Sequence, residues 1–348
     1  MKIGVVLFNL GGPDGPEAVR PFLSNLFCDP AIISLPAILR LPLGQFIAWR
    51  RAPVARQIYD RIGGSSPIVP QTQAQADALE KNLRGRGHDA KVVMAMRYWK
   101  PFADAAVSTI KAFGPDVLIL LPLYPQYSTT TTASSLADFG RAAVRAGLDI
   151  PVRRICCFPD DPGFVAAHVR LLRTALGQRR SGVDYRVLFS AHGLPKRIVN
   201  RGDPYPWQVE RSVGAILKGL GQSIDYQICY QSRVGRLEWI GPSTDAEIAR
   251  AGNEGKGVIV VPVAFVSEHS ETLVELDIEY GHLAERSGVR DYIRVPTLGV
   301  AQEFIDGLGA LVDAALSGRQ VVTSGSGRLC PVSCGGCGYA VEEGAQGR

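Results

Sequence analysis

The chain of 348 residues lacks several features that would place it in a specialised class. It has no uncharged apolar stretch of about 18 residues, so no helix is expected to span a membrane. Its net charge of +5 is small and its basic residues are scattered, which excludes a nucleic-acid-binding stripe. No GxGxxG motif follows the first expected strand, so a dinucleotide site is not indicated. The 46% of hydrophobic and 20% of charged residues are typical of a globular protein.

The opening segment and the cysteines indicate a reducing compartment. The apolar start Met1–Phe8 is short and is soon followed by Gly11-Gly12-Pro13, so it does not resemble a secretory signal. Without such a signal, the seven cysteines are more readily metal ligands than disulfide partners. We therefore expect a cytoplasmic protein of the size of an enzyme.

Short runs of β-branched residues alternate with longer helical patterns, which is typical of βαβ units and parallel sheets. The expected strands are Lys2–Leu10, Ala90–Met96, Asp116–Leu121, Val152–Ile155, Tyr185–Ser190, Ile224–Cys229, Gly257–Val263 and Tyr292–Val295. The expected fold is α/β, with two similar Rossmann-like halves, each a parallel four-stranded sheet flanked by helices. The halves would span residues 1–150 and 151–300. Residues 301–348 would supply a closing helix that returns to the first half, followed by a cysteine-rich tail.

Two segments of the first half allow more than one interpretation. The turn Asn9–Pro13 could hold an anion, although a plain tight turn is favoured. Residues 31–49 are unusually apolar for an insertion after a first strand. They form either ordinary core or an exposed lip that meets lipid or a flat hydrophobic ligand. The cations Arg50 and Arg51 directly after this segment favour the lip.

A row of acidic residues and one histidine occurs at helical spacing in the second half. Its members are Glu268, Glu271, Glu275, Glu279 and His282. With about 3.6 residues per turn, all of them fall on one helix face. Such a stripe is commonly a solvated surface. Here it begins where the expected buried strand of residues 256–265 ends, and the carboxyl ends of parallel strands are where ligands bind. We therefore expect the row to meet a cation or protons.

A histidine directly follows another expected strand of the second half. His192 lies in a turn marked by Gly193 and Pro195. A lone histidine is usually structural, but a neutral imidazole at a strand's carboxyl end can accept a proton or bind a divalent metal. His192 and Glu271 are therefore the candidate centre for proton abstraction and metal handling.

Three cysteines near the end of the chain form a separate pattern. Cys330, Cys334 and Cys337 lie among glycines and a proline that allow a tight turn around a metal. Zinc or an iron–sulfur cluster would need a fourth ligand, for which Cys156 or Cys157 is the expected source. A reactive or unstructured tail is the alternative.

The chain resembles the ferrochelatase family, whose members insert ferrous iron into a porphyrin. The resemblance runs nearly end to end and rests on many separate blocks in one order. These are Asn9–Pro13, Arg61–Ile68, Met96–Tyr98, Leu121–Tyr127, Phe189–Pro195, Val199–Pro206, Tyr230–Ser232, Trp239–Pro242 and Glu271–Tyr280.

The resemblance implies roles for matching residues. His192 would be the catalytic histidine, with Glu271 across from it and the iron substrate handled by both. Glu275, Glu279 and His269 would form a path for metal or protons, on a helix with a π-type distortion. The implied porphyrin-binding residues, several within a lip at residues 31–66, are Arg51, Tyr59, Ser66, Arg97, Tyr98, Trp239 and Ile33.

The resemblance also implies partners and a cofactor. The substrates would be protoporphyrin IX and Fe²⁺, and the product would be protohaem, at the terminal step of haem biosynthesis. Some ferrochelatases carry a [2Fe–2S] cluster, which favours iron–sulfur over zinc for Cys330, Cys334 and Cys337. Thr129 stands where the animal branch has its distant cysteine, so Cys156 or Cys157 would supply the fourth ligand. Peripheral contact with the inner membrane is expected, no nucleic acid is, and a homodimer is allowed.

Two alternatives stay open at this level. A related chelatase could act on another tetrapyrrole, as a cobaltochelatase or a coproporphyrin ferrochelatase does. From another class, a two-lobed binding protein or haem carrier could be built from paired Rossmann-like halves. A carrier would bind the ring without inserting a metal, so a metallation assay separates these functions.

Overall fold

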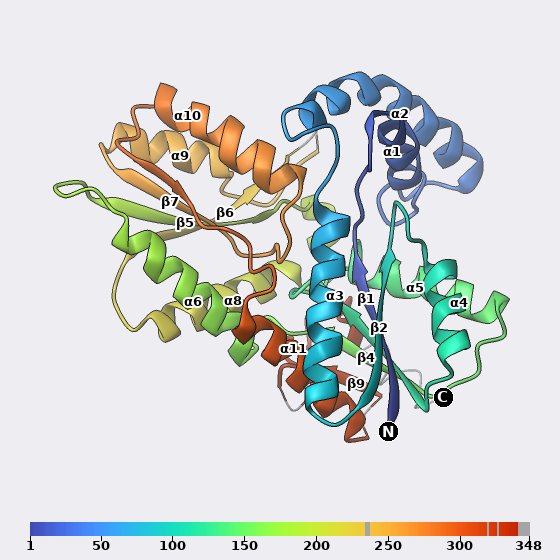
Figure 1. Ribbon diagram of the computed structural model, residues 1–348. Helices are drawn as coiled ribbons and strands as arrows, with labels where there is room; N and C mark the ends of the chain where they lie inside the picture. The colour runs from blue at the N-terminus through green and yellow to red at the C-terminus, as the bar shows by residue number, and fades with distance from the viewer. Residues whose placement is uncertain (234–236, 319, 326, 340–348) are drawn as a thin grey trace. The chain divides into compact units, whose positions relative to one another are not determined.

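The chain forms two units, each built around one parallel β-sheet (Figure 1). The computed structural model describes residues 1–233, 237–318, 320–325 and 327–339. The first unit comprises Met1–Cys157 and Leu308–Thr323, and the second comprises Phe158–Gly307 and Ser324–Arg348. These bounds differ from the expected ones, because the fourth strand belongs wholly to the first unit and the closing helix α11 (Gln302–Leu316) is divided between the two.

The first unit contains a five-stranded sheet in the order β2-β1-β3-β4-β9. Its strands are β1 (Lys2–Asn9), β2 (Asp89–Met96), β3 (Val117–Pro122), β4 (Val152–Cys157) and β9 (Val321–Thr323). The expected count of four was wrong, since β9 pairs with β4 after the closing helix. The three residues of β9 lie in the segment after the closing helix, where no strand was expected.

The helices of the first unit lie between its strands in the sequence, with four of them between β1 and β2. They are η1 (Pro16–Ala18), α1 (Val19–Phe27), α2 (Ala37–Asp60), α3 (Ile68–Gly85), α4 (Ala103–Phe113) and α5 (Thr132–Arg145). Helices α4 and α5 bury apolar side chains such as Val107 and Phe139 against Phe8 and Leu118 of the sheet. The ring centroids of Phe8 and Phe139 lie 5.5 Å apart in an edge-to-face arrangement.

The second unit contains a four-stranded parallel sheet in the order β6-β5-β7-β8, as expected. Its strands are β5 (Tyr185–His192), β6 (Asp225–Gln231), β7 (Gly257–Pro262) and β8 (Tyr292–Arg294). Its helices are α6 (Pro162–Gly177), α7 (Lys196–Val199), α8 (Tyr205–Leu220), α9 (Thr244–Asn253), the π-helix η2 (Glu271–Glu279) and α10 (Tyr280–Arg286).

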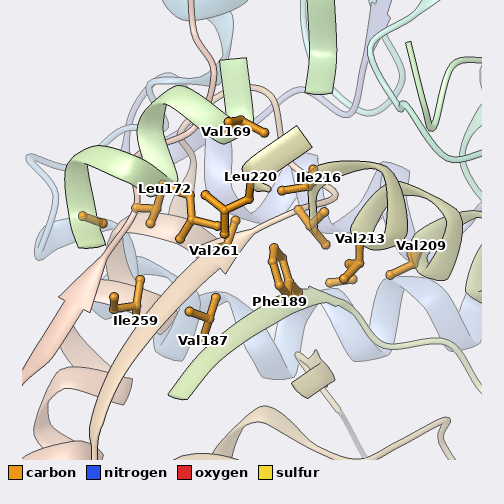
Figure 2. Close-up of a cluster of buried hydrophobic side chains, with 14 of the residues drawn as sticks. Val169, Leu172, Val187, Phe189, Val209, Val213, Ile216, Leu220, Ile259 and Val261 are labelled. Carbon is orange, nitrogen blue, oxygen red and sulfur yellow. The ribbon is translucent and has the colours of Figure 1, made fainter. Parts of the chain in front are cut away.

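Both faces of this second sheet are buried. Figure 1 shows α6 and α8 on one face, with α9 and α10 on the other. Because side chains alternate along a strand, Val187 and Phe189 pack against α6 and α8 (Figure 2), while Leu188 packs against α9 and α10. This two-sided burial explains why the central strands β5 and β7 consist of largely apolar residues. It also holds the carboxyl ends of β5, β6 and β7 in place, where the candidate site lies.

The apolar segment of the first unit is mostly exposed, which favours the lip over ordinary core. Its helix α2 buries the small residues Gly44, Ala48 and Ala52 and, near its end, Tyr59. A Cβ atom on Gly44 would lie 2.8 Å from the carbonyl oxygen of Phe27, so α1 and α2 pack closely there. The exposed apolar side chains around α2 are Leu35, Ile38, Leu39, Leu41, Leu43, Phe46, Trp49 and Val54. Within the described residues, no helix is long and apolar enough to cross a membrane.

The turn after β1 is a packed structural turn. The side chain of Asn9 donates to Thr72 Oγ1 at 3.1 Å and accepts the Leu10 N–H at 2.9 Å. A Cβ atom on Gly12 would lie 2.5 Å from Ser66 Oγ, so only glycine fits there. The plain tight turn, which the sequence favours over an anion site, agrees with this packing.

Candidate active site

His192 is the last residue of β5, at the carboxyl end of the second sheet. Its Nδ1 lies 2.7 Å from the carbonyl oxygen of Gly193. Since a carbonyl only accepts hydrogen bonds, Nδ1 carries a proton, and in the neutral imidazole Nε2 holds the free electron pair. Nε2 lies 3.7 Å from Oε1 of Glu271. The side chain of His192 is 39% exposed, so it can reach a bound substrate.

Glu271, the first residue of η2, lies between two imidazoles. Its Oε2 is 3.5 Å from Nε2 of His269, opposite the contact of its Oε1 with His192. Burial raises the pKa of Glu271, but the positive charge of His192 and the hydrogen bond of His269 outweigh burial and lower the pKa to about 2. Glu271 is therefore a carboxylate at every pH of interest, and it stabilises positive charge on either histidine.

His269 is buried beside this carboxylate. Its backbone is held by Thr272, and its ring lies 4.7 Å from the ring of Phe265, centroid to centroid. Within the described residues, no group hydrogen-bonds to Nδ1 of His269. The structure thus brings together three of the predicted residues, His192, Glu271 and His269, around one carboxylate.

Glu275 is held by four donors. It accepts the Ser232 N–H at 2.8 Å, the Ser232 hydroxyl, the Gln231 amide at 3.2 Å and the Tyr280 hydroxyl at 3.1 Å. Burial and the neighbouring charge of Glu271 nevertheless raise its pKa. Two carboxylates in one site therefore have pKa values shifted in opposite directions, an arrangement that separates a permanent anion from a group able to carry a proton.

The other members of the acidic row have different surroundings. Glu268 is half-buried and accepts Arg294 at 2.6 Å and the Thr297 N–H at 3.0 Å, so it belongs to an ion pair away from Glu271. Glu279 is exposed at the end of η2, and His282 is exposed on α10. The expectation that the row forms one uniform face was wrong, because η2 is π-helical and the row extends beyond it at both ends.

Sequence reasoning missed several side chains that shape the site. Ser232, whose φ of 60° is in the left-handed region, directs both its N–H and its hydroxyl at Glu275. Gln231 pairs in register with His192 and also reaches the Glu271 carbonyl at 3.3 Å. Tyr205 of α8 is buried near Glu271 and hydrogen-bonds with the backbone of His192. Gln231 and Ser232 stand within a block that carried the resemblance, which was the available signal.

Trp239 lies next to the histidine turn. Its backbone pairs with Pro195, and a Cβ atom on Gly193 would lie 3.2 Å from the Trp239 ring. Among the described residues, none hydrogen-bonds to the buried indole Nε1. Trp239 is therefore a neighbour of His192, as a wall residue of the second half would be.

The implied porphyrin residues of the first unit fall into two groups. Arg97 and Tyr98 both donate to Asp29, at 2.7 and 2.8 Å, and Ser134 joins them at 2.6 Å. Burial raises the pKa of Asp29, but Ser134, a backbone N–H and Arg97 together lower it, so the buried Asp29 is ionised. Sequence reasoning missed Asp29.

The remaining group lies around α2. Arg51 is exposed on α2, Tyr59 is buried near its end and Ser66 is buried beside the turn after β1. Ile33 is half-buried just before α2. Of these four side chains, only the Arg51 guanidinium is fully open to a carboxylate ligand.

Among the described residues, the cysteines do not form a cluster with the arrangement of a metal site. Cys156 and Cys157 are buried at the end of β4 in the first unit, whereas Cys330, Cys334 and Cys337 lie in the second unit. Across the described residues, no three or more His, Cys, Asp or Glu side chains gather as metal ligands would. The Sγ atom of Cys330 accepts the Gln208 amide at 3.0 Å.

Comparison with solved structures defines the fold as that of the chelatases. SirB of Bacillus subtilis, solved with Fe³⁺, aligns with a TM-score of 0.51 and 13% identity, over 91% of this chain and 96% of that one. The sirohydrochlorin chelatase SirB of Bacillus subtilis subspecies spizizenii, in complex with cobalt, gives the same values. At this identity, the likeness concerns the fold alone.

Sequence comparison identifies the family. The ferrochelatase family profile matches residues 2–316. A ferrochelatase of Phenylobacterium zucineum is 53% identical over 97% of this chain and 98% of its own length, and one of Caulobacter vibrioides is 50% identical over 97% of both. The chain belongs to the ferrochelatase family. This membership makes it a metal-insertion enzyme, a lyase that acts on a porphyrin with ferrous iron at the terminal step of haem biosynthesis.

Proposed function

We propose that this ferrochelatase inserts Fe²⁺ into protoporphyrin IX with His192 as the proton acceptor. Insertion releases two pyrrole protons, so a base must lie beside the macrocycle. The observation that carries the proposal is the geometry of His192: its Nδ1 is tied to a carbonyl at 2.7 Å, and its Nε2 is left as a base 3.7 Å from Glu271. The anion of Glu271 then stabilises the imidazolium that forms when Nε2 takes a proton.

Glu275 would receive the proton next. Its raised pKa brings its titration closer to neutral pH than that of Glu271. A proton on His192 could thus pass to Glu275 and on toward the exposed Glu279, which restores the base for the second pyrrole. His269 and the carboxylate oxygens would meet the incoming iron, since imidazole and oxygen donors suit ferrous iron that is losing water.

The porphyrin itself needs an apolar surface and a cationic edge, because it is a flat apolar disc with two carboxylates. For the carboxylates we assign Arg51, with Tyr59 and Ser66 as hydroxyl donors. Arg97, Tyr98, Ile33 and Trp239 would contact the ring. The fixed Asp29 network keeps Arg97 and Tyr98 rigid, which lowers the entropy lost on binding.

A metallation assay tests this function. Purified protein is mixed with Fe²⁺ and with protoporphyrin IX or coproporphyrin III, and the absorbance change of the ring is followed. We expect insertion with both rings tested side by side and a preference for protoporphyrin IX. A preference for coproporphyrin would reassign the substrate. Binding of the ring without metallation would indicate a carrier and contradict the proposal.

We further propose that the exposed apolar side chains of α2 contact a lipid surface. Ile38 is 82% exposed, and Phe46 and Trp49 are 58% and 55% exposed with ring centroids 6.0 Å apart. So many large apolar side chains around one helix exceed the scattered ones of an ordinary surface. Arg50 and Arg51 follow them and can meet anionic headgroups. Such contact suits an enzyme with water-insoluble substrate and product.

Removing two of these side chains should weaken membrane association. The variant with Ile38→Ser and Trp49→Ser is expected to bind anionic phospholipid vesicles at least about tenfold more weakly in co-sedimentation, because each buried side chain contributes about 1.5–3 kcal/mol. The control is Val144→Ser, which changes an 81% exposed residue on α5 of the same unit. Equal vesicle binding by both variants would contradict lipid contact. A lipid-independent dimer that the double variant abolishes would show that a second copy covers this surface instead.

We also propose a [2Fe–2S] cluster held by Cys330, Cys334 and Cys337, with Cys156 or Cys157 as the fourth ligand. The chemistry of the tail fits. Burial and the charge of Cys337 raise the pKa of Cys334, so these thiols are neighbours. The guanidinium of Arg328 donates to the carbonyl oxygens of Cys330 and Cys334, so the backbone of this segment curves around the Arg328 side chain. When bound, the cluster would supply a redox-active structural centre.

Cluster content can be measured directly. The purified protein should contain iron and acid-labile sulfide in equal amounts and absorb visible light, and Cys334→Ser should lose both. The matched control is Cys28→Ser, which changes a cysteine of the first unit outside the proposed set. A colourless wild-type protein without iron and sulfide, prepared anaerobically, would contradict the cluster.

A further inference from the structure

The edge strand β8 contacts η2 through two side chains on one face of the strand. The Tyr292 hydroxyl donates to the carbonyl oxygen of Leu276, a residue within η2, at 2.6 Å. Arg294, two residues further along, donates to both carboxylate oxygens of Asp277 at 2.6 Å each. Such a bidentate contact fixes geometry as well as charge. The same guanidinium also holds Glu268, just before η2, at 2.6 Å.

The contact of Tyr292 bears on the hydrogen-bond register of η2. In an α-helix the N–H of Tyr280 would donate to the carbonyl four residues earlier, that of Leu276. In the structure it donates to the carbonyl of Glu275, five residues earlier, as a π-helix requires. The Leu276 carbonyl accepts the Tyr292 hydroxyl instead. The side chain from β8 therefore hydrogen-bonds to the carbonyl that the α-helical register would pair with Tyr280.

The register determines how Glu275 is held. Tyr280 follows directly on η2, and its hydroxyl donates to Oε1 of Glu275 at 3.1 Å. The Gln231 amide reaches both the Glu271 carbonyl and the Glu275 carboxylate from β6. A change from π to α register would move Tyr280 relative to Glu275 and displace both carboxylates from the donors at the strand ends.

We propose that Tyr292 and Arg294 are positioning residues, which hold η2 in its π register and thereby place Glu271 and Glu275 beside His192. This inference rests on the proposed function of that centre. The hydrogen bonds of the two side chains go to Leu276, Asp277, Glu268 and Val295, and not to His192, Glu271 or Glu275. Their effect on catalysis passes through the backbone of η2, and it should appear in the rate of metal insertion more than in porphyrin binding.

The test compares two variants, Tyr292→Phe and Tyr185→Phe, each of which loses one tyrosine hydroxyl. Tyr292→Phe is expected to lower kcat for iron insertion about tenfold or more, since small displacements of catalytic groups have large effects, with the porphyrin KM changed less than about twofold. Hydrogen exchange at residues 276–281 should become faster or change its pattern. The control is Tyr185→Phe on β5 of the same sheet, whose hydroxyl donates to Asp291 at 2.5 Å at the opposite end of the strands. It should leave kcat unchanged.

Two further variants keep the outcomes distinguishable. Asp277→Asn weakens the Arg294 contact and leaves Tyr292 unchanged, and it should lower kcat in the same way if Tyr292→Phe does not fold. If His192→Ala abolishes insertion while both Tyr292→Phe and Asp277→Asn insert iron at the wild-type rate, the positioning role is wrong and the proposed function stands. If His192→Ala itself keeps the wild-type rate, the proposed function fails.

Discussion

Replacing His192 with alanine is expected to lower the rate of iron insertion by about 10²- to 10⁴-fold, the range typical of a general base. The reason is the environment of Nε2, the one ring nitrogen not tied to the Gly193 carbonyl, which lies 3.7 Å from the Glu271 anion. Alanine leaves neither a proton acceptor nor a cation for Glu271 to stabilise. The porphyrin KM should change little, because the proposed carboxylate contacts are made by other residues.

Insertion kinetics under saturating Fe²⁺, followed by absorbance, measure this effect. His282→Ala is the matched control, since His282 is exposed on α10 and has no contact with Glu271. Its rate should equal that of the wild type. A near-normal rate for folded His192→Ala would remove His192 from its assigned role.

Replacing Glu271 with glutamine is expected to lower kcat by about 10²- to 10³-fold, because a neutral amide cannot stabilise an imidazolium on His192. The side chain keeps its size, so the loss reports the charge. Glu285→Gln, at an exposed acid on α10, is the control and should insert iron normally. A wild-type rate for Glu271→Gln would show that the anion has no part in catalysis.

The lowered pKa of Glu271 predicts how the stability of the fold depends on pH. Its pKa in the folded protein is about 2, below the ordinary value of 4.5. A lowered carboxyl pKa means that the ionised form stabilises the fold above about pH 4.5 and that this contribution is lost as the pH falls toward 2. Over that window, urea unfolding should show the wild type losing free energy of unfolding relative to Glu271→Gln. The pH dependence of kcat should be different. If kcat falls as the pH is lowered toward 5, the same fall should occur in Glu271→Gln, because Glu271, with its pKa of about 2, does not titrate in that range.

Much of the fold could be predicted from local patterns. The eight expected strands are all present, because a strand buried on both faces has an apolar run that stands out from its flanking helices. The strand β9 was not expected, since it lies in the segment after the closing helix and its pairing with β4, more than 150 residues earlier in the chain, leaves no local pattern. The position of α2 was equally undetermined, because an apolar segment has the same composition whether it is core or exposed.

The site was predictable only in part. The position of His192 at a strand's carboxyl end and of the acidic row after another strand predicted that His192 and Glu271 lie together, and Nε2 of His192 is 3.7 Å from Oε1 of Glu271. The spacing could not separate Glu275 from Glu268, since both fit a regular helix. The tertiary contacts separate them. Gln231 of β6 hydrogen-bonds to Glu275 and holds it beside Glu271, whereas Arg294 of β8 binds Glu268.

The sequence by itself determined the family and the alternating α/β fold, because these depend on residue types and on periods within short segments. The tertiary structure decided which acids of the row meet His192, the opposite pKa shifts of Glu271 and Glu275, and the π register of η2. Each of these depends on burial and on hydrogen bonds between residues distant in sequence, such as Tyr292 with Leu276, and no local pattern encodes them.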